Sequence, residues 1–366
     1  MPEKKELKYG TLVERLTVSE IILNDGFWEI WGSLQSLHEE DYFIKKSVVI
    51  SWLSCMPPEK EVVASLMINS EGVCAAGLFF LDVIKIKKVF RFKTLNLLRS
   101  GDEKLDKIWP EYLMPKCNVE HSHNIGDWLQ ETMMATKTDC VNISLIKKEW
   151  ANDWLDRSSI RTRAVSLNNI TGHKAELSEL NFSKSIKRQL SQVEKLAKEI
   201  DSVGLSFGVS SDPLNSILKT AESHEAKWAK TDTPSGFENA EFKQALLSWV
   251  KNGDARIYDA CLGDSWVGST VVITSGLWSG FYISGYEKKD SNKWNVGIWM
   301  HCRVMETLKA EGFDYYDFMA GDELYKRRLS TKKIEFCDLL IINSEKWINA
   351  IKFPFASMLV DGNIIK

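Results

Sequence analysis

The sequence predicts an α/β fold of the α+β type, with two lobes that each hold a mixed, mostly antiparallel sheet flanked by helices. Helical and strand periodicities alternate in a similar order in both halves of the chain. Its 366 residues, 44% of them hydrophobic and 27% charged, are enough for two cores of ordinary globular composition. Fourteen tryptophans favour large buried cores over disorder.

The first half begins with helices, followed by strands in which apolar and polar residues alternate. The turn-rich connector Asn69 to Gly72 joins two of these strands as a hairpin, and Ser100 and Gly101 end the third. Its predicted elements are, in order, helices 26–37 and 42–53, strands 61–68, 73–80 and 92–98, helices 103–114 and 125–135, and strands 140–145 and 160–167.

The second half opens at Ser183, a favourable N-cap for a helix with an apolar stripe from Ile186 to Ile200. Tight turns at 262–265 and 275–276 separate three strands, and the next helix is apolar nearly all round and should be buried. The predicted order is helix 183–200, strand 205–209, helices 213–228 and 240–250, strands 255–261, 266–273 and 278–284, helix 296–310, strand 313–318, a helix from 322, and strand 336–342.

Composition narrows the functional classes. A net charge of −3 gives no general attraction for DNA or an anionic membrane. The seven cysteines lack metal-ligand spacing, which favours reduced, buried thiols. The longest apolar run, 73–90, is broken by charges, and the N-terminus lacks the apolar core of a signal peptide, so we expect a cytoplasmic protein without a transmembrane segment.

The stretch 313–328 is the most informative part of the sequence. An aromatic strand carrying Asp314 and Asp317 ends at Gly321, where Asp322 and Glu323 open a helix. Charges at a strand-to-helix junction are typical of α/β active sites. The alternative is a structural helix start, with Asp322 as the cap and Lys326 paired to an acid.

This stretch also resembles a known family. Asp317-Phe318 followed by Gly321-Asp322-Glu323-Leu324-Tyr325-Lys326 is similar to the C-terminal signature of the CelD-type acetyltransferases. These belong to the GNAT superfamily and are related to the Fem aminoacyltransferases. The resemblance implies two tandem GNAT-like lobes, at residues 1–170 and 171–350, with a C-terminal tail at 351–366.

The resemblance implies a donor site for acetyl-CoA or another acyl-CoA, with no metal. The pyrophosphate would bind the amides at the start of the helix after residue 295, where a helix dipole attracts anions. Backbone amides near the end of the preceding strand would polarise the thioester. The residues implied are Lys293, Asn295, Val296, Gly297 and Ile298 for the pyrophosphate, and Ile283, Ser284, Gly285 and Tyr286 for the thioester.

The catalytic candidates follow from the same junction. Asp317 or Glu323 would act as general base, with Asp322 as a further candidate, because a carboxylate in an aromatic pocket can acquire a raised pKa. Which carboxylate acts stays open. Tyr325 would protonate the leaving thiolate, or else pack on the sheet.

The acceptor candidates are basic and aromatic side chains. Lys326 and Arg327 could bind an anionic acceptor, such as a nucleotide-linked or lipid-linked sugar, or could instead pair with the preceding acids. His224 and Trp228 lie on a helix that the family places near the acceptor groove.

The sequence thus predicts an acyl-CoA-dependent N-acyltransferase, with an amino sugar or similar amine attacking the thioester directly in polysaccharide or envelope synthesis. One alternative is a Fem-like transferase that uses aminoacyl-tRNA; another is a non-catalytic GNAT-like binding protein. The sequence contains no GxSxG, HExxH, Walker A or GxGxxG motif, so it lacks the usual motifs of hydrolases, metalloproteases and nucleotide-hydrolysing enzymes.

Overall fold

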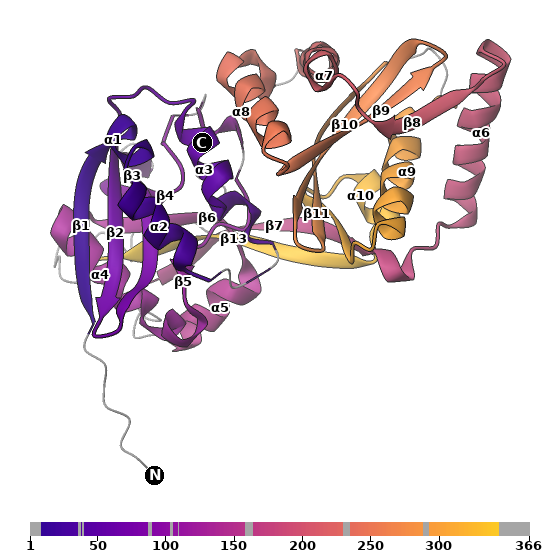
Figure 1. The fold of residues 1–366 in the computed structure, drawn as a ribbon. Coiled ribbons are helices and arrows are strands. Elements are labelled where there is room, and N and C mark those ends of the chain that lie inside the picture. The colour runs from indigo at the N-terminus through magenta and orange to yellow at the C-terminus, as the bar shows by residue number, and fades with distance from the viewer. Residues whose placement is uncertain are drawn as a thin grey trace. The chain divides into compact units, whose positions relative to one another are not determined.

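The computed structural model describes residues 9–35, 38, 40–86, 90–102, 105–108, 110–157, 164–229, 235–287 and 293–343. The chain divides into two compact units, unit 1 with residues 1–170 and 335–366 and unit 2 with residues 171–334. The expected C-terminal tail 351–366 lies outside the described residues. Figure 1 shows helices flanking a sheet in each unit, which confirms the predicted fold class.

Unit 1 contains a sheet with the strand order β1-β2-β3-β4-β6-β13, and β5 pairs with β3. Its strands are antiparallel except for β4 and β6, which are parallel over three residue pairs. The elements are β1 (Gly10–Thr17), α1 (Val18–Ile22), α2 (Asp25–Ser33), α3 (Lys46–Leu53), β2 (Glu61–Asn69), β3 (Gly72–Ile86), β4 (Phe90–Leu97), β5 (Lys116–Cys117), α4 (Ile125–Thr136), β6 (Cys140–Lys147), α5 (Lys148–Arg157) and, from the end of the chain, β13 (Lys332–Ile342).

Unit 2 contains a sheet with the strand order β7-β12-β11-β10-β9-β8. Helices α7 and α8 pack on one face of this sheet, and α9 and α10 lie on the other (Figure 1). The elements are β7 (Ala164–Glu176), α6 (Lys184–Ile200), β8 (Leu205–Val209), α7 (Pro213–Trp228), α8 (Ala240–Lys251), β9 (Ala255–Leu262), β10 (Ser265–Ser275), β11 (Trp278–Tyr286), α9 (Val296–Ala310), β12 (Tyr315–Ala320) and α10 (Leu324–Leu329).

The two halves of the chain exchange their last strands. Residues 172–176 of β7, which ends the first half, pair with β12 of unit 2. Residues 336–342 of β13, which ends the second half, pair with β6 of unit 1. Each unit therefore completes its sheet with a strand from the other half of the sequence.

The sequence prediction was wrong in several places. Of the helix predicted at 103–114, the described residues 105–108 and 110–114 form no α-helix, and Leu105–Ile108 is instead a short 3₁₀ helix. Pro110 lacks the amide that an α-helix would need. Strand β1 and helices α1 and α5 were not predicted, and the strand expected at 160–167 is observed from Ala164 onward. Asp314 lies exposed before β12 rather than within it.

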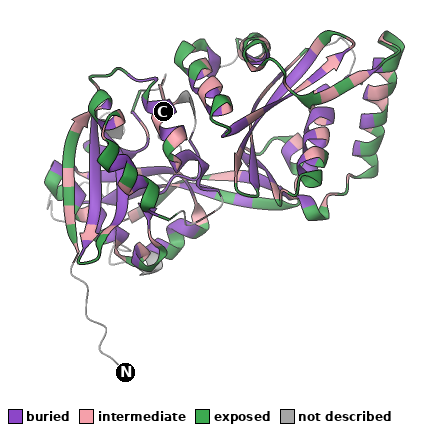
Figure 2. Ribbon diagram, in the orientation of Figure 1, coloured by how far each residue is buried: buried purple, intermediate pink, exposed green. Residues whose placement is uncertain are grey.

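The core of unit 2 explains why α9 is apolar nearly all round. One side of α9 packs on β10, and α6 covers the helix from outside. The predicted stripe of α6 is buried at Ile186, Leu190, Val193 and Ala197, while its basic residues face solvent (Figure 2).

Candidate functional site

The strands β11 and β12 separate at the place where the sequence predicted a donor site. Their parallel ladder joins only Trp278 to Tyr315, Ser279 to Tyr316 and Gly280 to Asp317 among the residues that the structure describes. Strand β11 then continues to Tyr286, with a bulge opposite Val271 and Val272 of β10. The backbone of β11 beyond Gly280 therefore has an edge that β12 does not cover.

The start of α9 lies beyond this edge and is arranged to attract an anion. The first backbone bond of the helix runs from the amide of Trp299 to the carbonyl of Asn295 at 3.2 Å. Asn295 is the N-cap, but its side chain makes no capping hydrogen bond, and the first turn contains no acidic residue. The amides of Val296, Gly297 and Ile298 precede that first helical bond, as an anion site requires.

Two backbone positions of β11 face the uncovered edge. The amide of Glu287 donates to the carbonyl of Val267 at 2.8 Å, so residue 287 faces β10. Because neighbouring residues of a strand direct their backbone groups to opposite edges, the backbone groups of Tyr286 and Ser284 both point away from β10, toward the uncovered edge. The amide of Tyr286 donates to Ser223 Oγ of α7 at 3.0 Å, which leaves the amide of Ser284 as the candidate donor to a thioester.

Two glycines near this edge allow other parts of unit 2 to approach their backbone closely. A Cβ at Gly285 would lie 2.7 Å from the carbonyl oxygen of Thr220, so glycine allows α7 to dock on β11. A Cβ at Gly297 would lie 2.9 Å from Cζ of Tyr286, so the tyrosine ring covers the first turn of α9. Burial raises the pKa of the Tyr286 phenol.

Asp317 lies in the interior of unit 2. Its carboxylate is 0% exposed and accepts hydrogen bonds from Trp278 Nε1 at 3.2 Å and from the amide of Met319 at 2.7 Å. The bond from Trp278 links β11 to β12, whereas the bond from Met319 lies within β12. The contacts suit a structural carboxylate, and the role of base for Asp317 remains a prediction.

The turn after β12 holds Asp322 in contacts that the sequence did not indicate. Helix α10 begins at Leu324 with Glu323 as N-cap, so the alternative in which Asp322 caps this helix was wrong. Asp322 Oδ1 instead lies 2.8 Å from His173 Nε2 and 3.1 Å from Arg327 Nε. The hydrogen bond from His173, and then the charge of Arg327, lower the pKa of this carboxyl.

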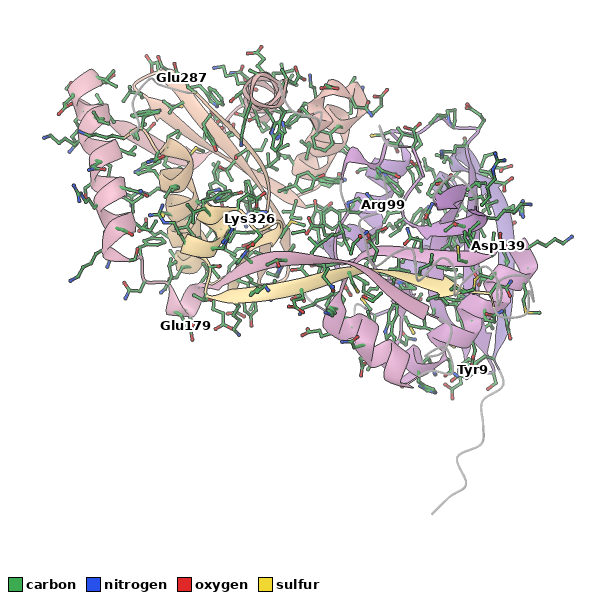
Figure 3. The ribbon with its side chains drawn as sticks, turned by 180° about the vertical axis from the view of Figure 1, so that it is seen from behind. Tyr9, Arg99, Asp139, Glu179, Glu287 and Lys326 are labelled. Atoms are coloured by element: carbon green, nitrogen blue, oxygen red, sulfur yellow. The ribbon has the colours of Figure 1, made fainter. Side chains whose placement is uncertain are left out.

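Lys326, labelled in Figure 3, is buried in unit 2. Its Nζ donates to the carbonyl of Ala320 at 2.5 Å and lies 3.1 Å from Glu323 Oε2. Arg327 donates to the carbonyl of Asp322. Both cations therefore have partners within the turn, whereas the Glu323 side chain is 56% exposed and accessible to solvent.

Tyr325 belongs to an aromatic cluster between α9, β12 and α10. Its ring stacks on His301 at 5.2 Å, and His301 Nδ1 lies 2.9 Å from Tyr316 Oη. Burial, and then the charge of Lys326, lower the pKa of His301 to about 3. Burial, followed by Glu323 and Tyr286, raises the pKa of Tyr325, so its phenol keeps the proton that a general acid must donate.

His224 and Trp228 lie on the α7 side of the sheet, with ring centroids 5.7 Å apart. His224 Nδ1 lies 2.8 Å from Ser235 Oγ, and burial and Lys227 lower its pKa to about 4, so the ring is neutral near pH 7. His224 lines a pocket of about 740 Å³ at the end of β11, together with Ser223, Trp266, Tyr286 and Glu287. Figure 3 labels Glu287 at this end of the strand.

Two residues of this site escaped the sequence analysis. Ser223 is a serine within a helix, and nothing in its local sequence indicates that it bonds the edge of β11. His173 follows Gly172 near the expected lobe boundary, and its contact with Asp322 spans 149 positions of the sequence. Such contacts depend on tertiary packing, which residue patterns do not encode locally.

The part of the chain that matches a known family contains the candidate donor site. Residues 183–327 match the family described as acetyltransferase (GNAT) domain, and this segment contains α9, β11, β12 and the turn after β12. A search of the curated proteins finds no match. The match assigns residues 183–327 to a GNAT acetyltransferase domain and supports an acyltransferase activity, while the CelD-type subfamily is not established by it.

Solved structures show the same fold at low identity. The chain is similar to FemX, with 10% identity, a TM-score of 0.54, and coverage of 93% of this chain and 99% of that one. It is also similar to L-PGS from Bacillus licheniformis, with 11% identity, a TM-score of 0.53, and coverage of 94% and 97%. A conserved protein of unknown function from Bacteroides thetaiotaomicron aligns with 10% identity, a TM-score of 0.55, and coverage of 91% and 100%.

Within the described ranges, no group of three or more His, Cys, Asp or Glu side chains is arranged to hold a metal ion. No helix in the same part of the chain is long and apolar enough to cross a membrane.

Proposed function

We propose that the protein is an acyl-CoA-dependent N-acyltransferase whose donor binds in unit 2. The observation that carries this proposal is the separation of β11 from β12 beside the uncapped start of α9. The amides of Val296, Gly297 and Ile298 would hold the pyrophosphate, with Lys293 and Asn295 nearby. The extended arm of the donor would lie along the β11 edge between Ile283 and Tyr286, as an added strand does.

The reaction we propose is direct attack of a neutral amine on the thioester carbonyl. The Ser284 amide would stabilise the oxyanion, since a preorganised backbone donor is effective where charge develops. Glu323, which solvent reaches, would take the proton from the amine; Asp317 and Asp322 remain the other candidates. As the C–S bond breaks, Tyr325 would protonate the leaving thiolate, so that an amide and a free thiol are formed.

The acceptor that we propose is an amino sugar or a similar amine, used in polysaccharide or envelope synthesis in the cytoplasm. The similarity of 317–326 to the CelD-type signature supports this choice. A nucleotide-linked or lipid-linked sugar would suit an enzyme with basic side chains near the turn. His224 and Trp228 would contact the acceptor from the α7 side.

Aminoacyl-tRNA is a second candidate donor, because the fold resembles FemX over nearly the whole chain. The exposed basic residues of α6, among them Lys184, Lys187 and Arg188, would then contact RNA phosphates. A net charge of −3 makes this donor less favourable than acyl-CoA. A non-catalytic binding protein is the third possibility, and it would show neither transfer reaction.

Donor-induced stabilisation tests the proposal. Acetyl-CoA should raise the melting temperature by binding the folded state, whereas tRNA should not. Gly297→Glu should abolish the shift, because its charge opposes the pyrophosphate. Gly297→Ala is the matched control, since it meets the Tyr286 ring in the same way but adds no charge. Equal shifts in wild type and Gly297→Glu would exclude this helix start as the donor site.

A further inference from the structure

We infer that α7 competes with the donor for the edge of β11, with Ser223 occupying the hydrogen-bonding groups of Tyr286 that the donor arm needs. This inference rests on the proposed acyl-CoA donor. It makes Ser223 a positioning residue and the described conformation a closed form of the donor site.

The hydrogen bonds of Ser223 are those that an amide of the donor arm would make. Ser223 Oγ donates to the carbonyl of Tyr286 at 2.7 Å and accepts from the amide of Tyr286 at 3.0 Å. Both groups of Tyr286 point away from β10, because the neighbouring Glu287 amide bonds to β10. One hydroxyl thus satisfies a donor and an acceptor of the strand, as one peptide-like group would.

The close docking of α7 places Ser223 at this edge. The backbone of Thr220 lies against Gly285, one turn before Ser223 on the helix. Ser216, one turn earlier still, donates to Asp259 Oδ2 of β9 at 2.7 Å. The helix is therefore fixed to the sheet by Ser216 at β9 and by Ser223 at β11, and only the second contact uses groups of the uncovered edge.

The space beside this contact suits an incoming chain. The pocket of about 740 Å³ at the end of β11 is lined by Ser284 and Tyr286 of β11, by Trp266 of β10, and by Lys219 and Ser223 of α7. An arm that enters along Ser284 reaches Ser223 next. Donor binding then requires the Ser223 hydroxyl to leave Tyr286. The apparent dissociation constant equals the intrinsic one divided by the fraction of molecules in which this hydroxyl has left, so a small open fraction weakens binding.

The test is the affinity of the full-length protein for acetyl-CoA, measured by titration calorimetry. Ser223→Ala removes both bonds to Tyr286, and we expect the dissociation constant to fall about 3- to 10-fold. Ser223→Thr keeps the hydroxyl and should bind as the wild type does. Ser216→Ala also removes a bond between α7 and the sheet, but not at β11, and should leave the affinity within about twofold.

Hydrogen exchange adds a readout that does not depend on the donor. The Tyr286 amide should exchange faster in Ser223→Ala than in the wild type or in Ser223→Thr, because its acceptor is gone. Weaker or unchanged donor binding by Ser223→Ala would overturn the inference, since Ser223 would then support the site or have no part in it. If the wild type bound no acetyl-CoA, the proposed donor itself would be wrong.

Discussion

Replacing Gly285 tests how closely α7 must approach β11. A Cβ at this position would lie 2.7 Å from the carbonyl oxygen and 2.8 Å from Cα of Thr220, inside the 3.4–4 Å of ordinary contact. Because the opposing atoms are backbone, no side-chain rotation can relieve the contact, and α7 has to move. Overpacking of this kind typically costs about 1–3 kcal/mol, and we expect Gly285→Ala to destabilise unit 2 by that amount.

Urea unfolding, followed by tryptophan fluorescence, measures this cost. Gly208→Ala in β8 is the matched control, because a Cβ there meets nothing within 4 Å. The control should be neutral or slightly stabilising, by up to about 1 kcal/mol, since alanine restricts the unfolded chain. Equal midpoints for the two variants would refute the close packing of α7 on Gly285, and with it the placement of Ser223.

Three other substitutions probe the turn after β12 and the core beneath it. Glu323→Gln should lower kcat about 100-fold with an unchanged urea midpoint, and near-normal turnover would remove Glu323 as the base. Lys326→Met should destabilise the fold by about 1–3 kcal/mol, because Ala320 and Glu323 lose their partner, and should leave the acceptor KM unchanged. A raised KM at normal stability would instead assign Lys326 to substrate binding. The pKa of His301 is about 3 in the folded protein and about 6.5 in the unfolded chain. Below pH 6.5 the unfolded chain therefore binds a proton that the folded protein does not, and the free energy of unfolding falls by about 2 kcal/mol at pH 5. His301→Phe should lose correspondingly less stability between pH 7.5 and 5, and an identical loss in both proteins would contradict the burial of a neutral His301.

The sequence predicted the elements of unit 2 more accurately than those of unit 1. The strand 205–209 and the helix 213–228 were predicted with the bounds that the structure shows, because Gly204 and Asp212-Pro213 delimit them chemically. The helix expected over 103–114 failed at Pro110, whose missing amide outweighs the helical propensity around it. Strand β1 was missed because its burial is mixed and its polar residues mask the alternation.

The parts of the candidate site that are formed by consecutive residues could be predicted from the sequence. The start of α9 and the acidic turn after β12 could be located from Gly297 and from Gly321 to Lys326 alone. The partners of these residues could not, because Ser223, His173 and Thr220 reach them from distant parts of the sequence. Lys326 illustrates the limit, because residue order leaves open whether it binds substrate or a neighbouring acid, whereas its contacts with Ala320 and Glu323 appear only in the structure.

A crystal structure of the protein with acetyl-CoA tests the central claim most directly. We predict that the pyrophosphate binds the amides of Val296, Gly297 and Ile298, and that the arm is hydrogen-bonded to Ser284 with Ser223 displaced from Tyr286. A donor bound elsewhere, with the edge of β11 still held by Ser223, would contradict it.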